Sequence, residues 1–174
     1  SDCTTPDRST SVRRGDDAPL AHLQAGVQGL INCGCDYVVI PCNTAHFWFH
    51  ELIKQGVHIT HIVDSVADQL RELGVVNTTI GVMGTQGTIE LGLYQYRLNK
   101  LGWNCVCPTP EEMSTKVQPA IDLIKAGHTD QAYLLLIDVV DRLVSSGVGA
   151  VVLGCTEIPL AVREERWKSI PLVN

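Results

Sequence analysis

The chain has 174 residues, a formal net charge of −6 at pH 7 and a hydrophobic fraction of 45%. It is long and apolar enough to bury a sizeable core, which excludes a disordered chain, and its negative charge argues against nucleic acid as a partner. No positively charged start precedes an apolar segment, and no apolar stretch approaches the length of a membrane span. We therefore expect a soluble, cytoplasmic protein without a membrane partner.

The first half of the chain alternates amphipathic stretches with short apolar runs, which glycine, proline and asparagine separate. In chain order we predict a polar functional loop over 1–17, a helix over 18–32, a strand over 37–41, a helix over 44–55, a strand near 58–63 and a helix over 65–73. Gly74 follows as the predicted boundary between two lobes.

The second half repeats this alternation. In chain order we predict a strand over 79–83, a Gly/Thr-rich turn over 84–88, a helix over 89–101, a strand near 103–107, helices over about 114–126 and 129–146, a strand over 149–153, and a short charged helix before the apolar end IPLVN. Strands that alternate with helices are typical of βαβ units and a mainly parallel sheet, so the predicted class is α/β.

The sequence contains seven cysteines. Because their number is odd and several flank strand-like runs, we expect free thiols in a reducing compartment rather than a disulfide framework. Cys33 and Cys35 form one CxC pair, and Cys105 and Cys107 form another. Structural zinc sites usually have CxxC spacing and four clustered ligands, so we interpret these four as ordinary strand or loop cysteines and predict no metal.

Two matching segments are the most informative part of the sequence: YVVIPCNTAHF at 37–47 and AVVLGCTEIPL at 150–160. Each is an apolar run followed by Pro or Gly, a cysteine, and small polar residues. The runs predict buried parallel strands, which place Cys42 and Cys155 at carboxyl edges of sheets. Ligands bind at such edges in open α/β sheets, so the two thiols are predicted to hold a substrate between them.

Two thiols on opposite sides of one carbon can invert its configuration. A thiolate removes the proton next to a carboxylate and a thiol returns a proton from the other side, with the two sulfurs about 7 Å apart. We expect the turns after Cys42 and Cys155 to open helices, whose N–H groups stabilise the developing charge and lower the pKa of the thiols. Asn43, Thr44 and Thr156 add short polar donors.

Other interpretations stay open at this point. The two cysteines could be buried structural residues at strand ends. His46, close to Cys42, also allows a Cys–His nucleophile in a hydrolase or transferase, but that leaves Cys155 without a role. The turn GTQGT could bind phosphate, although its glycine pattern fits neither a Walker sequence nor GxGxxG.

Together, PCNTAH, GTQGT and GCTEIPL resemble the aspartate/glutamate racemase superfamily, whose members racemise amino acids without pyridoxal phosphate. The resemblance covers almost the whole chain. It implies two pseudo-symmetric, Rossmann-like or flavodoxin-like lobes with parallel sheets, and an active site in the cleft between them. It also implies that Cys42 and Cys155 are the catalytic acid/base thiols, that Asn43, Thr44 and Thr156 hold the α-carboxylate and amino group, and that no cofactor is needed.

The same resemblance assigns further substrate-binding residues. TPDRS is similar to the family's PDR loop, which implies that Arg8 binds a side-chain carboxylate, and IKAG implies the same role for Lys125. Thr85 and Thr88 resemble the family's second-lobe turn that faces the cleft.

Two residues next to the cysteine motifs, His46 and Glu157, are expected to orient or tune the thiols. The GCTE form resembles the branch of aspartate racemases and broad-specificity amino-acid racemases. Glutamate racemases of cell-wall synthesis carry a histidine in place of Glu157, which argues against that branch.

We therefore predict a cofactor-independent racemase, homodimeric by resemblance, that acts on aspartate first and on glutamate or a broad range next. Its first lobe would comprise 1–73 with 167–174 and would lack the family's first strand and last helix; its second lobe would comprise 74–166. Alternatives are a maleate isomerase or a hydantoin racemase with the same two cysteines, or a non-catalytic binding module for small acids.

Overall fold

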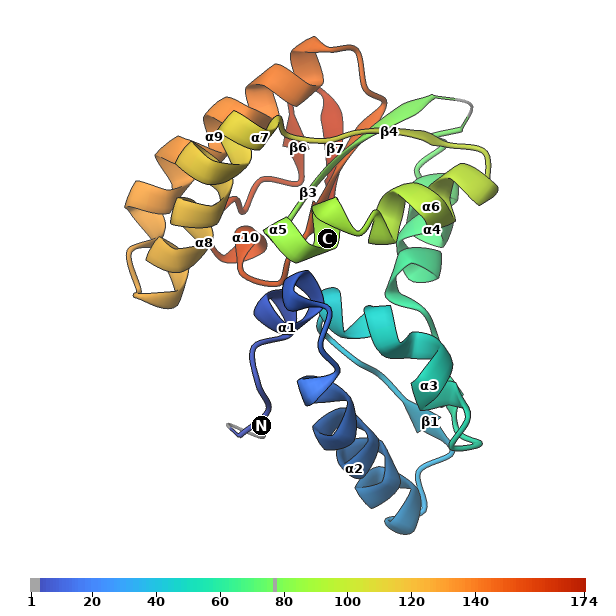
Figure 1. The fold of residues 1–174 in the computed structure, drawn as a ribbon. Helices are drawn as coiled ribbons and strands as arrows, with labels where there is room; N and C mark the ends of the chain where they lie inside the picture. The colour runs from blue at the N-terminus through green and yellow to red at the C-terminus, as the bar shows by residue number, and fades with distance from the viewer. Residues whose placement is uncertain (1–3, 77) are drawn as a thin grey trace.

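Two separate sheets organise the protein, whose computed structural model describes residues 4–76 and 78–174 (Figure 1). The strands are β1 Tyr37–Val38, β2 His58–Ile59, β3 Thr79–Gly84, β4 Asn104–Val106, β5 Ala150–Gly154, β6 Arg166–Trp167 and β7 Ile170–Val173. β1 and β2 form a parallel pair. The other five run in the order β4–β3–β5–β7–β6, parallel except for β6 with β7. The predicted α/β class with mainly parallel sheets is confirmed, whereas pseudo-symmetry stays a prediction.

The helices of the first part lie around the small sheet, except for the last of them, which packs on the large sheet. They are α1 Arg8–Arg14, α2 Ala18–Asn32, the 3₁₀ helix η1 Thr44–Trp48, α3 Phe49–Ile53 and α4 Ile62–Glu72. α2 matches its prediction, but the predicted polar loop over 1–17 contains a helix. Asp7 caps α1 by accepting a hydrogen bond from Thr10 N, and Gly15 ends it in the left-handed conformation.

The helices of the second part flank the large sheet. They are α5 Gln86–Glu90, α6 Leu93–Lys100, α7 Pro110–Glu112, the π-helix η2 Met113–Val117, α8 Gln118–Lys125, α9 Thr129–Ser145 and α10 Ile158–Ala161. The helix predicted over 89–101 is interrupted, because Gly92 adopts φ 65°. The predicted charged helix near the end is also wrong. There β6 and β7 form a hairpin whose turn residues, Lys168 and Ser169, have positive φ.

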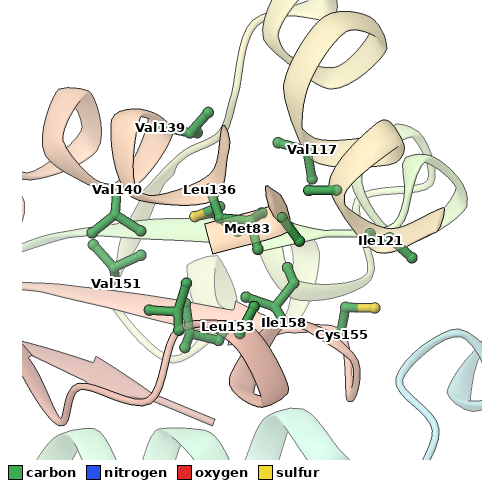
Figure 2. Close-up of a cluster of buried hydrophobic side chains, with 14 of the residues drawn as sticks. Met83, Val117, Ile121, Leu136, Val139, Val140, Val151, Leu153, Cys155 and Ile158 are labelled. Carbon is green, nitrogen blue, oxygen red and sulfur yellow. The ribbon is translucent and has the colours of Figure 1, made fainter. Parts of the chain in front are cut away.

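Helices cover both faces of the large sheet because its strands are apolar on both sides. Val151 and Leu153 pack in one buried cluster with side chains of α8 and α9. Ala150 and Val152 pack in the opposite cluster with side chains of α4 and α6. Figure 1 shows the two sets of helices on either side of the sheet, and Figure 2 shows part of the first cluster around Met83. In the described ranges, no helix is long and apolar enough to cross a membrane.

The predicted division of the chain into lobes is wrong in two places. β7 pairs with β5, so the assignment of 167–174 to the first lobe fails. α4 packs on the large sheet, since Val63 and Leu70 of this helix lie in one buried cluster with Val82 of β3. It therefore does not belong to a first lobe that ends at residue 73. An amphipathic pattern predicts that a helix buries one face, but it does not say which sheet receives that face.

We therefore distinguish a small region, residues 4–61, from a large region, residues 62–76 and 78–174. The small region has its own modest core, which includes Val38 and Leu52. α1 lies where the two regions meet and contacts both η1 and α5 (Figure 1). There the backbone N–H of Gly87 donates to Ser9 Oγ at 3.2 Å.

Candidate active site

Both cysteine turns open onto one cavity between the small and large regions. Cys42 follows β1 in a turn where its backbone N–H donates to Ile40 O at 2.9 Å, and Cys155 directly follows β5. The cavity has a volume of about 90 Å³, and both cysteines line it. The structure thus brings together two segments that lie far apart in the sequence.

Most of the sequence-predicted site residues line this cavity. They are Arg8, Cys42, Asn43, Thr44, Thr85, Lys125, Cys155, Thr156 and Glu157. Thr88 and His46, which were also predicted, do not line it. Sequence reasoning missed the remaining lining residues, Asp7, Ser9, Pro41 and Gly154. A signal for Asp7 was present, since it directly precedes Arg8 in the TPDRS segment.

Cys155 is a buried thiol that donates a hydrogen bond. It is 3% exposed, and its Sγ donates to Glu157 Oε2 at 3.0 Å. Burial raises the pKa of Cys155 to about 12, with a further contribution from the Glu157 carboxylate. The prediction that a following helix lowers this pKa is therefore wrong. α10 has only 4 residues, and the backbone N–H groups of Glu157 and Ile158 do not offset burial. Figure 2 shows the sulfur pointing away from Leu153 and Ile158.

Arg8 lies beside the other cysteine. It is the first residue of α1, and it lines the cavity together with Cys42. Burial acts to lower the pKa of Arg8, but the Cys42 sulfur and the carboxylates of Asp7 and Glu157 raise it overall. The two sulfurs thus have opposite partners: Cys155 faces a carboxylate and Cys42 faces a guanidinium.

Two cations and two carboxylates share the cavity wall: Arg8, Lys125, Asp7 and Glu157. Burial acts to raise the pKa of both carboxyl groups. Hydrogen bonds and the positive charge of Lys125 nevertheless lower the pKa of each below its ordinary value. For Asp7 these hydrogen bonds come from Thr10, and for Glu157 they come mainly from the side chains that precede it. The cavity is therefore strongly polar, with its charges balanced.

Three threonines join the two regions at the wall of the cavity. Thr44 Oγ1 lies 3.2 Å from Thr85 Oγ1 and 3.1 Å from Thr88 Oγ1, and the latter two are 3.0 Å apart. Thr88 is buried, so it supports Thr44 and Thr85 rather than facing a ligand. Thr85 also caps α5 by accepting a hydrogen bond from Thr88 N.

His46 is buried between the two regions. Its Nε2 lies 3.0 Å from Ile40 O, and its Nδ1 accepts from Ile62 N at 3.4 Å. Burial lowers the pKa of His46. Both ring nitrogens thus form hydrogen bonds with backbone groups, which argues against the alternative in which His46 activates Cys42 as a nucleophile.

Comparison with known proteins identifies the family. The sequence model of the Asp/Glu/Hydantoin racemase family matches residues 2–174. The chain belongs to this family.

Relatives within the Asp/Glu/Hydantoin racemase family differ in substrate. The chain is 25% identical over 173 residues to the broad specificity amino-acid racemase RacX of Bacillus subtilis. This alignment covers 99% of this chain and 73% of RacX. It is 31% identical over 134 residues to the glutamate racemase of Persephonella marina, and this alignment covers 75% of this chain. The chain spans about half the length of that glutamate racemase (49%).

Among solved structures, the aspartate racemase of Picrophilus torridus superimposes with a TM-score of 0.83 at 26% identity, over 99% of this chain and 71% of that one.

Four further cysteines within the described ranges do not line the cavity: Cys33, Cys35, Cys105 and Cys107. Burial raises the pKa of Cys105 to about 12 and that of Cys107 to about 11. Across the described part of the chain, no group of three or more His, Cys, Asp or Glu side chains is placed to hold a metal ion.

Proposed function

We propose that this member of the Asp/Glu/Hydantoin racemase family is an amino-acid racemase that works without a cofactor and uses Cys42 and Cys155 as its two acid/base groups. The observation that carries the proposal is that both thiols line one cavity that also contains two cationic side chains. One thiol on each side of the α-carbon supplies both proton transfers that inversion requires.

The different partners of the two sulfurs indicate how a turnover starts. Cys155 holds its proton at neutral pH because burial raises its pKa, so it is the acid. Cys42, against the guanidinium of Arg8, is the base. Its thiolate takes the α-proton, and the electron pair of the broken C–H bond moves towards the α-carboxylate. Cys155 then protonates the opposite face. The site returns to its starting form by converting the other enantiomer or by exchanging protons with water.

Neutral donors in the cavity suit the charge that develops on the α-carboxylate. Asn43, Thr85 and Thr156 all line the cavity beside the cysteines. Donors that are already oriented stabilise an enolate-like oxygen more than water does, because they need no reorganisation during the reaction.

The charged side chains favour an acidic amino acid as the substrate. Arg8 and Lys125 match its side-chain carboxylate, and Asp7 matches its ammonium group. The small volume, about 90 Å³, favours aspartate over the longer glutamate. The aspartate racemase of Picrophilus torridus supports the same choice by its structural similarity.

Chiral chromatography of aspartate and asparagine tests this assignment, because the two have equal length but only aspartate has a second carboxylate. We expect the protein to racemise aspartate and not asparagine. Arg8→Gln and Lys125→Met should each lower kcat/KM for aspartate at least tenfold, by loss of a charged hydrogen bond or ion pair. Lys54→Met is the matched control, because Lys54 is exposed and pairs with Glu51.

Equal racemisation of asparagine would contradict the role of the two cations. Absence of racemisation for every acidic amino acid would contradict the proposed function. A covalent adduct between maleate and either cysteine, seen by mass spectrometry, would instead indicate the maleate isomerase alternative.

A further inference from the structure

One buried tyrosine touches both cysteine-bearing turns. Tyr94 lies on α6 and is 1% exposed. Its hydroxyl donates to Asn43 Oδ1 at 2.5 Å, and Asn43 directly precedes η1 and follows Cys42. This hydrogen bond connects the large region to the small region at the edge of the cavity.

The ring of Tyr94 also lies against the backbone that leads to Cys155. A Cβ placed on Gly154 would lie 2.8 Å from Tyr94 Cε2 and 2.9 Å from Met83 O. Real side chains do not approach so closely, so this position requires glycine in the observed packing. Burial raises the pKa of Tyr94, and the nearby Cys155 adds to this shift, which is consistent with their proximity.

The direction of the hydrogen bond decides which end of the Asn43 amide can meet a substrate. An asparagine side chain has one acceptor, Oδ1, and one donor group, Nδ2H₂. Because Tyr94 donates to Oδ1, the donor group is left for the cavity that Asn43 lines. Burial raises the pKa of Tyr94, so its hydroxyl keeps its proton and remains a donor.

We propose that Tyr94 is a positioning residue that orients the Asn43 amide with its NH₂ group towards the substrate carboxylate and holds the Cys42 and Cys155 turns at a fixed separation. This inference rests on the proposed racemase function for its kinetic consequences. The hydrogen bond to Asn43 orients the amide, and the packing of the ring against Gly154 keeps the two turns apart.

Tyr94→Phe tests the orienting role because it removes only the hydroxyl and keeps the ring. With the amide free to turn, carboxylate binding should weaken, and we expect KM for aspartate to rise about tenfold. Tyr133→Phe is the matched control. The hydroxyl of Tyr133 also donates a hydrogen bond to a side-chain oxygen, Glu164 Oε1 at 2.8 Å, but neither residue lines the active-site cavity. The control should leave KM unchanged.

A double-mutant cycle separates positioning from general support of the fold. Asn43→Ala removes the group through which Tyr94 acts, so adding Tyr94→Phe should then change KM less than twofold. If Tyr94→Phe raises KM by the same factor in both backgrounds, or leaves KM unchanged in the wild-type background, the proposal is overturned.

A readout without catalysis distinguishes failure of this inference from failure of the proposed function. The ¹H–¹⁵N signals of the Asn43 side-chain amide, assigned by their loss in Asn43→Ala, should shift in Tyr94→Phe and stay unchanged in Tyr133→Phe. This holds whether or not any amino acid is racemised. Unchanged Asn43 amide signals in Tyr94→Phe would overturn the positioning role even in an active racemase.

Discussion

The turn that carries Cys42 and the turn that carries Cys155 have similar sequences but different surroundings. Cys155 directly follows a strand that is buried along its whole length within the five-stranded sheet, and its thiol donates to Glu157. Cys42 follows a strand of only 2 residues, in a turn where Val39 is 70% exposed. Its sulfur faces Arg8, which another helix supplies.

This difference shows that a repeated motif can give a chemically unequal pair. The thiol of Cys155 is buried beside a carboxylate, and both burial and the carboxylate favour its protonated form. The sulfur of Cys42 is less buried and shares the cavity wall with the guanidinium of Arg8. Acid and base roles in the proposed reaction therefore follow from the environments of the two turns and not from the motif itself.

The largest expected effect is in the reactivity of the two thiols. At pH 8 a thiol with a pKa of about 12 is ionised to a fraction on the order of 10⁻⁴. Iodoacetamide should therefore modify Cys42 at least a hundredfold faster than Cys155, as measured by mass spectrometry of peptides. Glu157→Gln should speed modification of Cys155, because the carboxylate raises the pKa of this thiol. Faster modification of Cys155 than of Cys42 in the native protein would contradict the proposed assignment of Cys155 as the acid and Cys42 as the base.

A smaller effect is expected in the stability of the strands that lead to the cysteines. Val152 is fully buried between helices in the large sheet, and Val38 belongs to the smaller core. Val152→Ala should lower the free energy of unfolding by about 2–3 kcal/mol, and Val38→Ala by about 1 kcal/mol, because a small core relaxes more easily around a cavity. Urea unfolding measures both. Equal losses would show that the two strands are packed alike.

The junction between the regions should respond to acid. Burial lowers the pKa of His61 from 6.5 to about 3, with Arg97 as the next cause, so the native protein keeps it neutral while the unfolded chain takes up a proton below pH 6.5. Stability should therefore fall as the pH drops from 6.5 towards 3. Two neighbours, Asp64 and His46, have lowered pKa values and act in the same direction.

His61→Asn tests this acid dependence. Asparagine can still cap α4 by accepting from Val63 N, as His61 does at 3.2 Å, but it does not titrate. The slope of unfolding free energy between pH 6 and about 4 should become shallower than in the native protein. His58→Asn, at an exposed position, is the control and should keep the native slope. An unchanged slope in His61→Asn would show that His61 does not cause the loss of stability in acid.

The smallest effect is expected for a surface ion pair that joins α1 to α5. Arg13 Nε lies 3.2 Å from Glu90 Oε2, and both side chains are about half exposed. Arg13→Ala should cost less than about 0.5 kcal/mol, and the loss should shrink further in high salt. A loss above 2 kcal/mol in thermal unfolding would mean that this pair, rather than the three threonines at the cavity wall, holds the two regions together.

Much of the fold could be predicted because its signals are local. The apolar run at 149–153 and the amphipathic stretch at 18–32 each specify one element, and both occur nearly as predicted. The placement of α4 and β7 could not be predicted in the same way, because a pattern shows that a face is buried but not which partner covers it.

The candidate site also has a part that local signals predict and a part that they do not. Cys42 and Cys155 could be predicted from their paired motifs, and both line the cavity. The position of Tyr94 next to them gave no signal, because a tyrosine on an amphipathic helix is usually an ordinary core residue. Its contacts arise only when α6 packs across the end of β5 and meets η1.

The most direct test of the two-thiol account is α-proton exchange of each aspartate enantiomer in D₂O, followed by NMR, for the native protein, Cys42→Ala and Cys155→Ala. The account predicts that the native protein exchanges and racemises both enantiomers, and that neither variant racemises. Any exchange that remains should be confined to a different enantiomer in each variant, because each surviving thiol serves one face of the carbon. Racemisation that persists in either single variant would contradict the account.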